Sequence, residues 1–315
     1  MTAPPVLFLM GPTASGKTEL AVALHRQLPV DVVSVDSAMV YRGMDIGTAK
    51  PSRELLAEVP HRLIDICDPA ESYSAGRFCE DARAAIAEIR AVGRIPLLVG
   101  GTGLYFRSLE QGFSPLPASD PAVRAEVELE AEREGWEKMH AKLMKIDPLS
   151  AQKIHPNDPQ RIQRALEIYR LSGRPPSALY GRGREQGLAL PLIKLVVAPA
   201  ERSRLHAAIR SRFLAMLEAE LLAEVEGLYQ RGDLHAGLPA MRLVGYRQVW
   251  QYLAGECDYK DMINKAISAT RQLAKRQLTW LRAEQGANWF DAAAPACAGE
   301  VLNFLRRHPI FTGRV

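Results

Sequence analysis

The chain has 315 residues, of which 47% are apolar and 24% are charged, and its formal net charge is +4. This composition supports a sizeable core and about two domains of roughly 150 residues each, and it excludes a wholly disordered chain. No apolar run approaches the roughly 18 residues that span a bilayer. The short run Val6–Met10 leads into a glycine-rich segment rather than a signal-cleavage site. We therefore expect a soluble, cytoplasmic protein with no membrane partner.

The four cysteines, Cys67, Cys79, Cys257 and Cys297, are widely spaced and form no CxxC pair. This spacing argues against a zinc site and against a disulfide framework. The seven histidines are scattered as well. Neither a metal cluster nor a Ser-His-Asp triad is therefore expected.

The first hundred residues alternate short apolar runs with segments of helical period. The expected strands are Val6–Met10, Val32–Val35, Leu63–Ile66 and Pro96–Val99, with a fifth, Leu192–Val197, after a long gap. Helical patterns, such as 17–28 and 76–92, lie between the first four strands. Fully apolar strands separated by helices predict a parallel sheet covered on both faces, an α/β core of the doubly wound type.

The long gap before the fifth strand has a different character. It begins with spaced prolines, continues through charged helical patterns near 121–146 and 157–172, and ends in a Gly/Arg-rich loop at 181–184. The simplest interpretation is a helical insertion domain at 113–190 between two strands of the sheet. The core then comprises residues 1–112 and 191–315. Helical patterns fill most of its second part, over 202–231, 241–253 and 259–284.

Charge is unevenly distributed along the chain. Residues 1–112 hold 11 Lys and Arg against 13 Asp and Glu, whereas the remainder holds 29 against 23. Most of the basic excess lies in two windows, 160–185 and 260–282. Such windows are most often solvated helix faces, but they also fit a polyanion such as nucleic acid. Charge alone leaves both interpretations open.

Residues 11–18 read GPTASGKT and match the phosphate-loop pattern G-x-x-x-x-G-K-[ST]. An apolar strand precedes the pattern and an amphipathic helix follows it, so a chance glycine-rich turn is disfavoured. In such a loop, successive N–H groups point at phosphate oxygens and the helix adds its positive N-terminal end. Lys17 would supply a charge to the distal phosphate and Thr18 a hydroxyl ligand for Mg²⁺. The pattern indicates a di- or triphosphate ligand without specifying the reaction.

Polar residues also follow two other predicted strands. Asp36 comes directly after Val32–Val35, and the segment 100–103, with Thr102, follows Pro96–Val99. Parallel strands present their carboxyl ends at one ligand crevice, so Asp36 should lie near the phosphate loop, as a base or a water-mediated metal contact. Asp36 could instead cap the next helix, and 100–103 could be a plain tight turn. Taken alone, these residues fit a small-molecule kinase as well as a nucleic-acid modifying enzyme.

Longer motifs extend over nearly the whole chain, from Leu7 to about Phe290. They are 11–18, Asp36-Ser37 with 41–51, 100–105, 154–158 with Arg161 and 164–167, Arg212-Phe213 with Met216-Leu217, and 241–246. In these motifs the sequence closely resembles the bacterial tRNA dimethylallyltransferases, also called tRNA isopentenyltransferases. At Leu243-Val244 the family more often has Ala-Ile, which is also an apolar pair. The residues after Phe290 match nothing characteristic of the family.

The resemblance implies a P-loop NTPase-like parallel sheet with an inserted helical domain that contacts tRNA. The implied reaction transfers a dimethylallyl group from dimethylallyl diphosphate to N6 of adenosine 37, in tRNAs that read codons beginning with U, and releases diphosphate. The phosphate loop would then hold a diphosphate leaving group, and its N–H donors, Lys17 and Mg²⁺ would stabilise the charge that develops. The adenine must flip out of the anticodon stem-loop to reach the site, which costs roughly a few kcal/mol. Basic residues would offset that cost through contacts with the RNA.

The resemblance also implies roles for single residues. Asp36 would accept the N6 proton, Thr102 would help to position Asp36, and Lys17 and Arg212 would complete the catalytic set, although Arg212 also fits an ordinary helix-surface arginine. The expected diphosphate-binding residues are Gly11, Pro12, Thr13, Ala14, Ser15, Gly16, Lys17 and Thr18, with Thr18 as the metal ligand. The expected tRNA-binding residues are Asp36, Ser37, Ala38, Met39, Thr102, Arg124, Gln160, Arg161, Ile162, Gln163, Arg164, Met241, Arg242, Leu243, Val244, Gly245, Tyr246, Lys275, Arg276 and Arg282.

Three other functions remain to be weighed against this one. A kinase that uses ATP, with Asp36 as base toward a hydroxyl, would leave 113–190 and 241–246 without a role. A non-catalytic RNA-binding module would not need Lys17, Thr18 and Asp36 intact. Enzymes that prenylate free adenosine nucleotides share the phosphate loop but do not need a basic insertion. We expect a monomer with no cofactor other than Mg²⁺.

Overall fold

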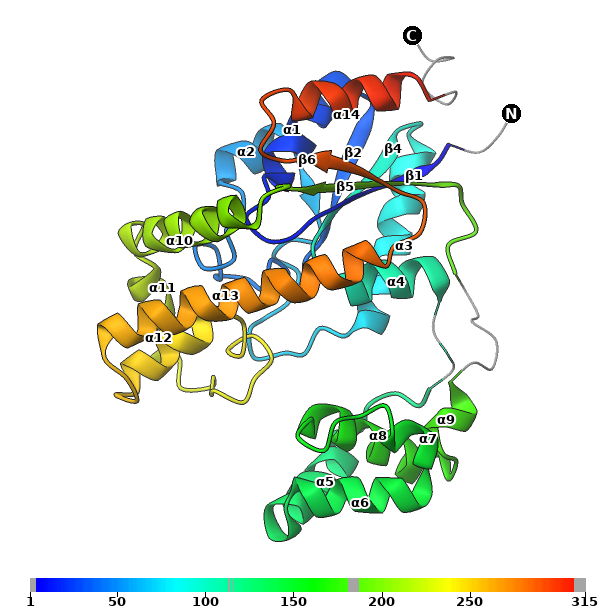
Figure 1. Cartoon of the computed structure of the whole chain (residues 1–315), viewed down its shortest axis with the longest axis vertical. Coiled ribbons are helices and arrows are strands. Elements are labelled where there is room, and N and C mark those ends of the chain that lie inside the picture. Colours follow the sequence, from blue (N-terminus) through cyan, green and yellow to red (C-terminus); the bar gives the residue numbers. More distant parts are fainter. Residues whose placement is uncertain (1–3, 113, 115, 181–186, 309–315) are drawn as a thin grey trace. The chain divides into compact units, whose positions relative to one another are not determined.

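The computed structural model describes residues 4–112, 114, 116–180 and 187–308. The chain divides into two units, Met1–Arg107 with Leu190–Val315, and Ser108–Ala189. It therefore leaves the first unit and later returns to it, as an insertion does (Figure 1). The sequence placed these junctions at 113 and 190. The Gly/Arg-rich loop at 181–184 and Phe113, the first residue of the expected insertion, lie outside the described residues.

Within the described residues, the first unit contains a six-stranded parallel sheet, in the order β3-β2-β4-β1-β5-β6. The strands are β1 (Val6–Met10), β2 (Val30–Val35), β3 (His61–Arg62), β4 (Ile95–Gly100), β5 (Leu192–Ala198) and β6 (Ala287–Asp291). The predicted α/β parallel sheet is confirmed. β5 pairs with β1 although the second unit separates them in sequence. The sheet is thus continuous across the insertion.

Helices of the first unit pack on both faces of this sheet, α1 and α14 on one and α3 and α4 on the other. The helices of this unit are α1 (Lys17–Gln27), α2 (Arg53–Glu58), α3 (Ala75–Ala91), α4 (Gly103–Gln111, which crosses the junction), α10 (Arg202–Glu218), α11 (Leu221–Tyr229), α12 (Tyr246–Leu253), α13 (Tyr259–Arg282) and α14 (Cys297–Arg306). Alternate residues of β1 face opposite sides. Leu7 and Leu9 join one core with α1 and α14, whereas the Phe8 ring lies 4.9 Å from that of Phe106 in α4. Burial on both faces explains why β1 is wholly apolar.

Two strands differ from the prediction. β3 is His61–Arg62, not Leu63–Ile66, because Leu63 and Asp65 have φ angles of 64° and 57°, in the left-handed region that a strand cannot contain. β6 was missed because its residues are only partly buried at the edge of the sheet, so Ala287–Asp291 carries no continuous apolar run.

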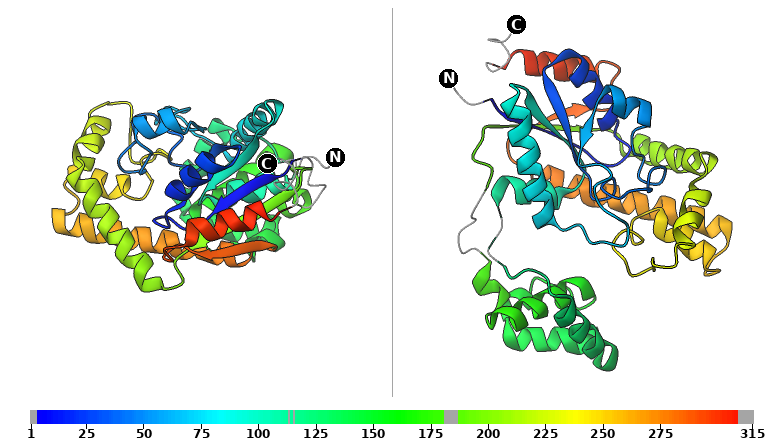
Figure 2. Two further views of the ribbon diagram at one scale, coloured as in Figure 1. Left: turned by 90° about the horizontal axis from the view of Figure 1, so that it is seen from above. Right: turned by 180° about the vertical axis from the view of Figure 1, so that it is seen from behind.

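The end of the chain, for which the sequence indicated no role, contributes to the core. Val301, Leu302 and Leu305 of α14 lie on one face of the helix and pack into the cluster that contains Leu20 and Leu24 of α1. Figures 1 and 2 show α14 beside α1 on one face of the sheet. α14 therefore completes that layer.

The second unit is a small helical assembly. Its helices are α5 (Pro121–Glu134), α6 (Trp136–Ile146), α7 (Pro148–Ala151), α8 (Pro159–Ser172) and α9 (Pro176–Leu179). An aspartate caps α5, α7 and α8, and in each the next residue is proline, whose fixed φ suits the first turn of a helix. Gly135, at φ 85°, separates α5 from α6. The core of the second unit includes Val127, Met139, Leu143 and Ile162. No described helix of the chain is long and apolar enough to span a membrane.

Candidate active site

The phosphate loop joins β1 to α1 and turns as its sequence requires. Gly16 has a φ of 75°, a conformation that glycine adopts without strain. A Cβ atom on Gly11 would lie 2.2 Å from the carbonyl oxygen of Val197 on β5, so only glycine fits there. Ala14 also has a positive φ, 59°, which is unusual for a residue with a side chain. The loop therefore holds a strained, tightly turned backbone at the carboxyl end of β1.

Two polar side chains inside this loop are poorly satisfied by the protein alone. The Lys17 ammonium donates to the Pro12 carbonyl at 2.6 Å. Burial lowers the pKa of Lys17 to about 8, an effect that nearby Asp36 opposes and Arg212 reinforces. The Ser15 hydroxyl is buried and has no hydrogen-bond partner among the described residues. A bound anion would relieve both, because it would stabilise the charged form of Lys17 and accept from Ser15.

Asp36 and Thr102 follow two adjacent strands, since Val35 of β2 pairs with Gly100 of β4. The Asp36 carboxylate accepts from the backbone N–H of Ala38 at 2.8 Å, which closes a turn at 37–40 instead of capping a helix. The Thr102 hydroxyl oxygen accepts from the Ser37 N–H at 3.1 Å. Thr102 therefore ties the 100–103 segment to the turn that carries Asp36.

Arg212 projects from α10 toward the same region. Its guanidinium donates to the Thr13 hydroxyl and to the Thr48 carbonyl, each at 3.4 Å. Burial lowers the pKa of Arg212, while Asp36 and Glu19 oppose this effect. These two partners distinguish Arg212 from an ordinary helix-surface arginine, and its side chain is half-buried. Arg212 thus places a half-buried positive charge beside the phosphate loop.

Gln277 of α13 is a site residue that the sequence analysis did not single out. Its side-chain oxygen accepts from the Thr13 N–H at 2.8 Å, and its side-chain nitrogen donates to the Gly101 carbonyl at 3.0 Å. One amide therefore links the phosphate loop to the segment that carries Thr102. The sequence marked the neighbours Lys275 and Arg276 by their charge. The role of Gln277 as a link between the two segments is visible only from the direction of its side chain.

Two cavities meet at these residues. The larger, about 700 Å³, is lined by Ser15, Lys17 and Thr18 of the phosphate loop. The smaller, about 410 Å³, has a mostly apolar and aromatic wall that includes Phe213 and Trp280. Both are also lined by Thr13, Asp36, Arg212 and Gln277. The acidic group therefore lies where an anion-binding cavity joins one suited to a flat, apolar group.

The expected tRNA-binding residues of the first unit are divided between this cavity and the surface. The smaller cavity is lined by Asp36, Ser37, Ala38, Thr102, Arg242, Leu243, Val244, Gly245, Tyr246 and Arg276, and Met39 lines the larger one. Lys275 and Arg282 are exposed on α13. Met241 is 1% exposed and lines neither cavity, so its side chain supports the 242–246 segment from within.

The expected tRNA-binding residues of the second unit lie on α5 and α8. Arg124, Gln160 and Arg161 are exposed there. Ile162 belongs to the core, and Gln163 is 6% exposed and donates to the Arg124 carbonyl. Both side chains are buried because a short helix turns part of each basic stretch inward, and contact of these two residues with RNA stays a prediction.

Arg164 is half-buried and already has partners within the second unit. It donates to the Pro117 carbonyl at 2.7 Å and pairs with the fully buried Glu167 at 2.9 Å. Glu167 also accepts from the Ser119 hydroxyl at 2.7 Å. Arg164 therefore holds the start of the unit against α8 as well as presenting charge.

Comparisons with known proteins agree with this geometry. The family model described as IPP transferase matches residues 39–284, and the model described as isopentenyl transferase matches residues 4–65. A curated relative, the tRNA dimethylallyltransferase of Thioalkalivibrio sulfidiphilus, is 63% identical over 283 residues, which is 90% of this chain and 88% of that one. The chain belongs to the tRNA dimethylallyltransferase family.

Solved structures of the family share the fold. The tRNA isopentenylpyrophosphate transferase of Bacillus halodurans is 38% identical, with a TM-score of 0.70 over 96% of this chain and 95% of that one. The tRNA isopentenylpyrophosphate transferase of Staphylococcus epidermidis is 30% identical, with a TM-score of 0.69 over 96% and 100%. A eukaryotic dimethylallyltransferase acting on tRNA is 26% identical, with a TM-score of 0.81 over 98% and 80%. The expected P-loop NTPase-like fold is thereby confirmed.

Proposed function

We propose that this chain transfers a dimethylallyl group from dimethylallyl diphosphate to N6 of adenosine 37, in tRNAs that read codons beginning with U, and releases diphosphate. Family membership supports dimethylallyl transfer to tRNA. The observation that carries the mechanism is the position of Asp36, on the wall shared by the phosphate-loop cavity and the mostly apolar cavity.

The phosphate loop would bind the diphosphate of the donor. Its backbone N–H groups, the Ser15 hydroxyl and the Lys17 ammonium can all donate to phosphate oxygens. Arg212 adds a second fixed charge next to Thr13. These donors are in place before the reaction, so they would stabilise negative charge as it develops on the oxygen that leaves the allylic carbon.

Asp36 would act on the acceptor. The N6 amine of adenine is a weak nucleophile, since its lone pair is delocalised into the ring. In the reaction, N6 forms a bond to the allylic carbon, the bond from that carbon to the diphosphate oxygen breaks, and the N6 proton passes to Asp36. General-base help of this kind is typically worth ~10²–10⁴ in rate. Thr102 would keep the turn that carries Asp36 in place.

The site also fits a magnesium ion bound together with the diphosphate. Among the described residues, no group of three or more His, Cys, Asp and Glu side chains could hold a metal unaided. Thr18 and Asp36 line the same cavity, and Mg²⁺ usually takes only one or two protein ligands beside phosphate and water oxygens. Thr18 would be a direct ligand. Bound Mg²⁺ would neutralise charge on the leaving group.

The smaller cavity would receive the flipped adenine, between the 242–246 segment and Trp280. Arg242 and Arg276 at its wall, with Arg124 and Arg161 on the second unit, would bind the anticodon stem-loop through its phosphates. Every residue proposed for the chemistry belongs to one chain, so we propose that the protein acts as a monomer. We propose that it acts in the cytoplasm, on tRNA.

One assay tests this function against its competitors. The protein is incubated with dimethylallyl diphosphate, Mg²⁺ and either unmodified tRNA or AMP, and diphosphate release is measured. We expect release that requires tRNA, with the product modified at N6 of adenosine 37. Release with AMP alone would indicate an enzyme of free nucleotides. In a parallel incubation with ATP in place of dimethylallyl diphosphate, ADP formation would indicate a kinase. No turnover in any incubation would indicate a binding module.

A further inference from the structure

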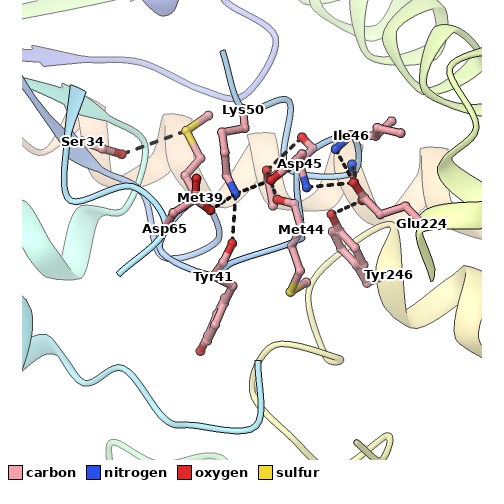
Figure 3. A network of polar contacts seen from close by, with 12 residues as sticks. Ser34, Met39, Tyr41, Met44, Asp45, Ile46, Lys50, Asp65, Glu224 and Tyr246 are labelled. Carbon is pink, nitrogen blue, oxygen red and sulfur yellow. Dashed lines mark hydrogen bonds and ion pairs between the residues drawn. The ribbon is translucent and has the colours of Figure 1, made fainter. Parts of the chain in front are cut away.

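Glu224 on α11 makes an unusual set of contacts with a loop distant in sequence. Its carboxylate accepts from three consecutive backbone N–H groups, those of Asp45 at 2.8 Å, Ile46 at 2.7 Å and Gly47 at 3.1 Å. It also accepts from the Tyr246 hydroxyl at 2.5 Å (Figure 3). Four neutral donors thus converge on one half-buried charge, and hydrogen bonds to a charged acceptor are about twice as strong as neutral ones.

Both segments tied by Glu224 form walls of the site. Gly47 and Thr48 line the smaller cavity, and Thr48 also accepts from Arg212 through its carbonyl. Tyr246 ends the 242–246 segment on the same wall. Glu224 itself is not among the residues that line the two cavities. It can therefore influence the reaction only through these neighbours.

The loop at 45–48 and the 242–246 segment are in close contact, so the distance between them can vary little. A Cβ atom on Gly47 would lie 2.5 Å from the Tyr246 ring, which is fully buried. Burial, and then the charge of Glu224, raise the pKa of Tyr246 far above its usual value. The hydroxyl therefore remains a donor to Glu224 across the working pH range.

The start of the same loop is held independently. The Lys50 ammonium donates to the Tyr41 carbonyl at 2.9 Å and pairs with Asp45 at 2.5 Å and Asp65 at 2.6 Å (Figure 3). Lys50 fixes Asp45 through its side chain, whereas Glu224 fixes the 45–47 backbone. Without Glu224, the part of the loop nearest the cavity would be free to move while its other contacts stayed intact.

We propose that Glu224 is a positioning residue for dimethylallyl transfer. Its carboxylate holds the loop at 45–48 against Tyr246, and this fixes the cavity wall that faces the adenine and that accepts a hydrogen bond from Arg212. This inference rests on the proposed function. A residue that acts in this way lowers the rate of the chemical step in the bound complex. It leaves the phosphate loop in place, and Arg212 keeps its hydrogen bond to Thr13 of that loop, so the affinity for diphosphate changes little.

The test compares Glu224→Gln, which removes the charge at nearly constant size, with Glu226→Ala as the matched control. Glu226 lies on the same helix and is exposed, and in the described part of the chain its carboxylate accepts a hydrogen bond only from Gln230. Single-turnover transfer is measured with saturating tRNA and dimethylallyl diphosphate, at a temperature where circular dichroism shows every variant folded. We expect a rate loss of at least about tenfold for Glu224→Gln, with inorganic diphosphate affinity within about twofold and Glu226→Ala unaffected.

Tyr246→Phe provides a second route, because it removes only the hydroxyl. We expect a loss of at least about threefold, and a double variant with Glu224→Gln no slower than Glu224→Gln alone, since both changes break the same tie. Unchanged single-turnover rates in both variants, or a loss confined to melting temperature, would overturn the proposal. A wild-type protein without tRNA-dependent transfer would refute the proposed function itself, and this inference with it.

Discussion

Asp36 offers the clearest separation of chemistry from recognition at the level of one side chain. Asp36→Asn keeps an oxygen that can accept from the Ala38 N–H, but it removes the base. We expect transfer to fall by at least about 10²-fold, with nearly unchanged affinity for tRNA. Single-turnover kinetics and anisotropy with a labelled anticodon stem-loop measure the two quantities. Loss of binding with normal chemistry would assign Asp36 to recognition.

Lys17 gives the site a pH dependence whose sign follows from its environment. Burial holds the pKa of Lys17 at about 8 in the free protein, below its usual 10.5. A diphosphate ligand favours the charged form. Above pH 8 the ligand must therefore bind together with a proton, and its affinity should fall by up to about tenfold per pH unit. Calorimetric titration of diphosphate between pH 7 and about 10 measures this.

Lys17→Arg is the control for that titration, because a guanidinium remains charged over the whole interval. We expect its diphosphate affinity to show no inflection near pH 8. If the variant and the natural protein gave the same pH profile, the titration would belong to another group.

Among the structural elements, α14 is the one whose contribution the sequence left open. Leu305 is fully buried against α1, so Leu305→Ala should lower the free energy of unfolding by about 2–5 kcal/mol. Asn303 on the same helix is exposed, and Asn303→Ala serves as the control. Urea denaturation followed by circular dichroism measures both. Equal stabilities would mean that α14 detaches from the sheet in solution.

Elements with a strong pattern could be predicted, and those shaped by local geometry could not. β1 is apolar throughout because both its faces are covered, so its run of five apolar residues identified it. The run Leu63–Ile66 is apolar apart from Asp65, but Leu63 and Asp65 have positive φ angles, which turn it into a bend. A short apolar run therefore suggests a strand without reporting the backbone conformation of its residues.

At the scale of the whole molecule, binding of a polyanion can be tested by the dependence of its affinity on salt concentration. Arg161 has a side chain that is 71% exposed, whereas Arg164 is half-buried with partners of its own. Arg161→Ala should weaken tRNA binding and reduce the slope of log affinity against log salt by about one unit. Arg161→Lys should preserve most of the slope. Salt titrations of stem-loop binding distinguish the two, and equal slopes would remove Arg161 from the interface.

The site as a whole could be predicted only as far as its residues follow a strand or form a motif. Asp36, Thr102 and the phosphate loop meet because parallel strands end at one edge of the sheet. Gln277 and Glu224 reach the same region from helices, and no spacing in the sequence reveals where their side chains point. The burial of Ile162 within a basic stretch could not be predicted either, because it also depends on the direction of the side chain.

The entry and exit of the second unit lie next to each other. The backbone N–H of Leu188 donates to the carbonyls of Leu109 and Glu110, at 3.1 and 3.2 Å. Because the insertion starts and ends at neighbouring residues, the pairing of the strands does not depend on its length. Such a module can be lengthened, shortened or exchanged without breaking the strand pairing of the first unit, which carries the proposed chemistry.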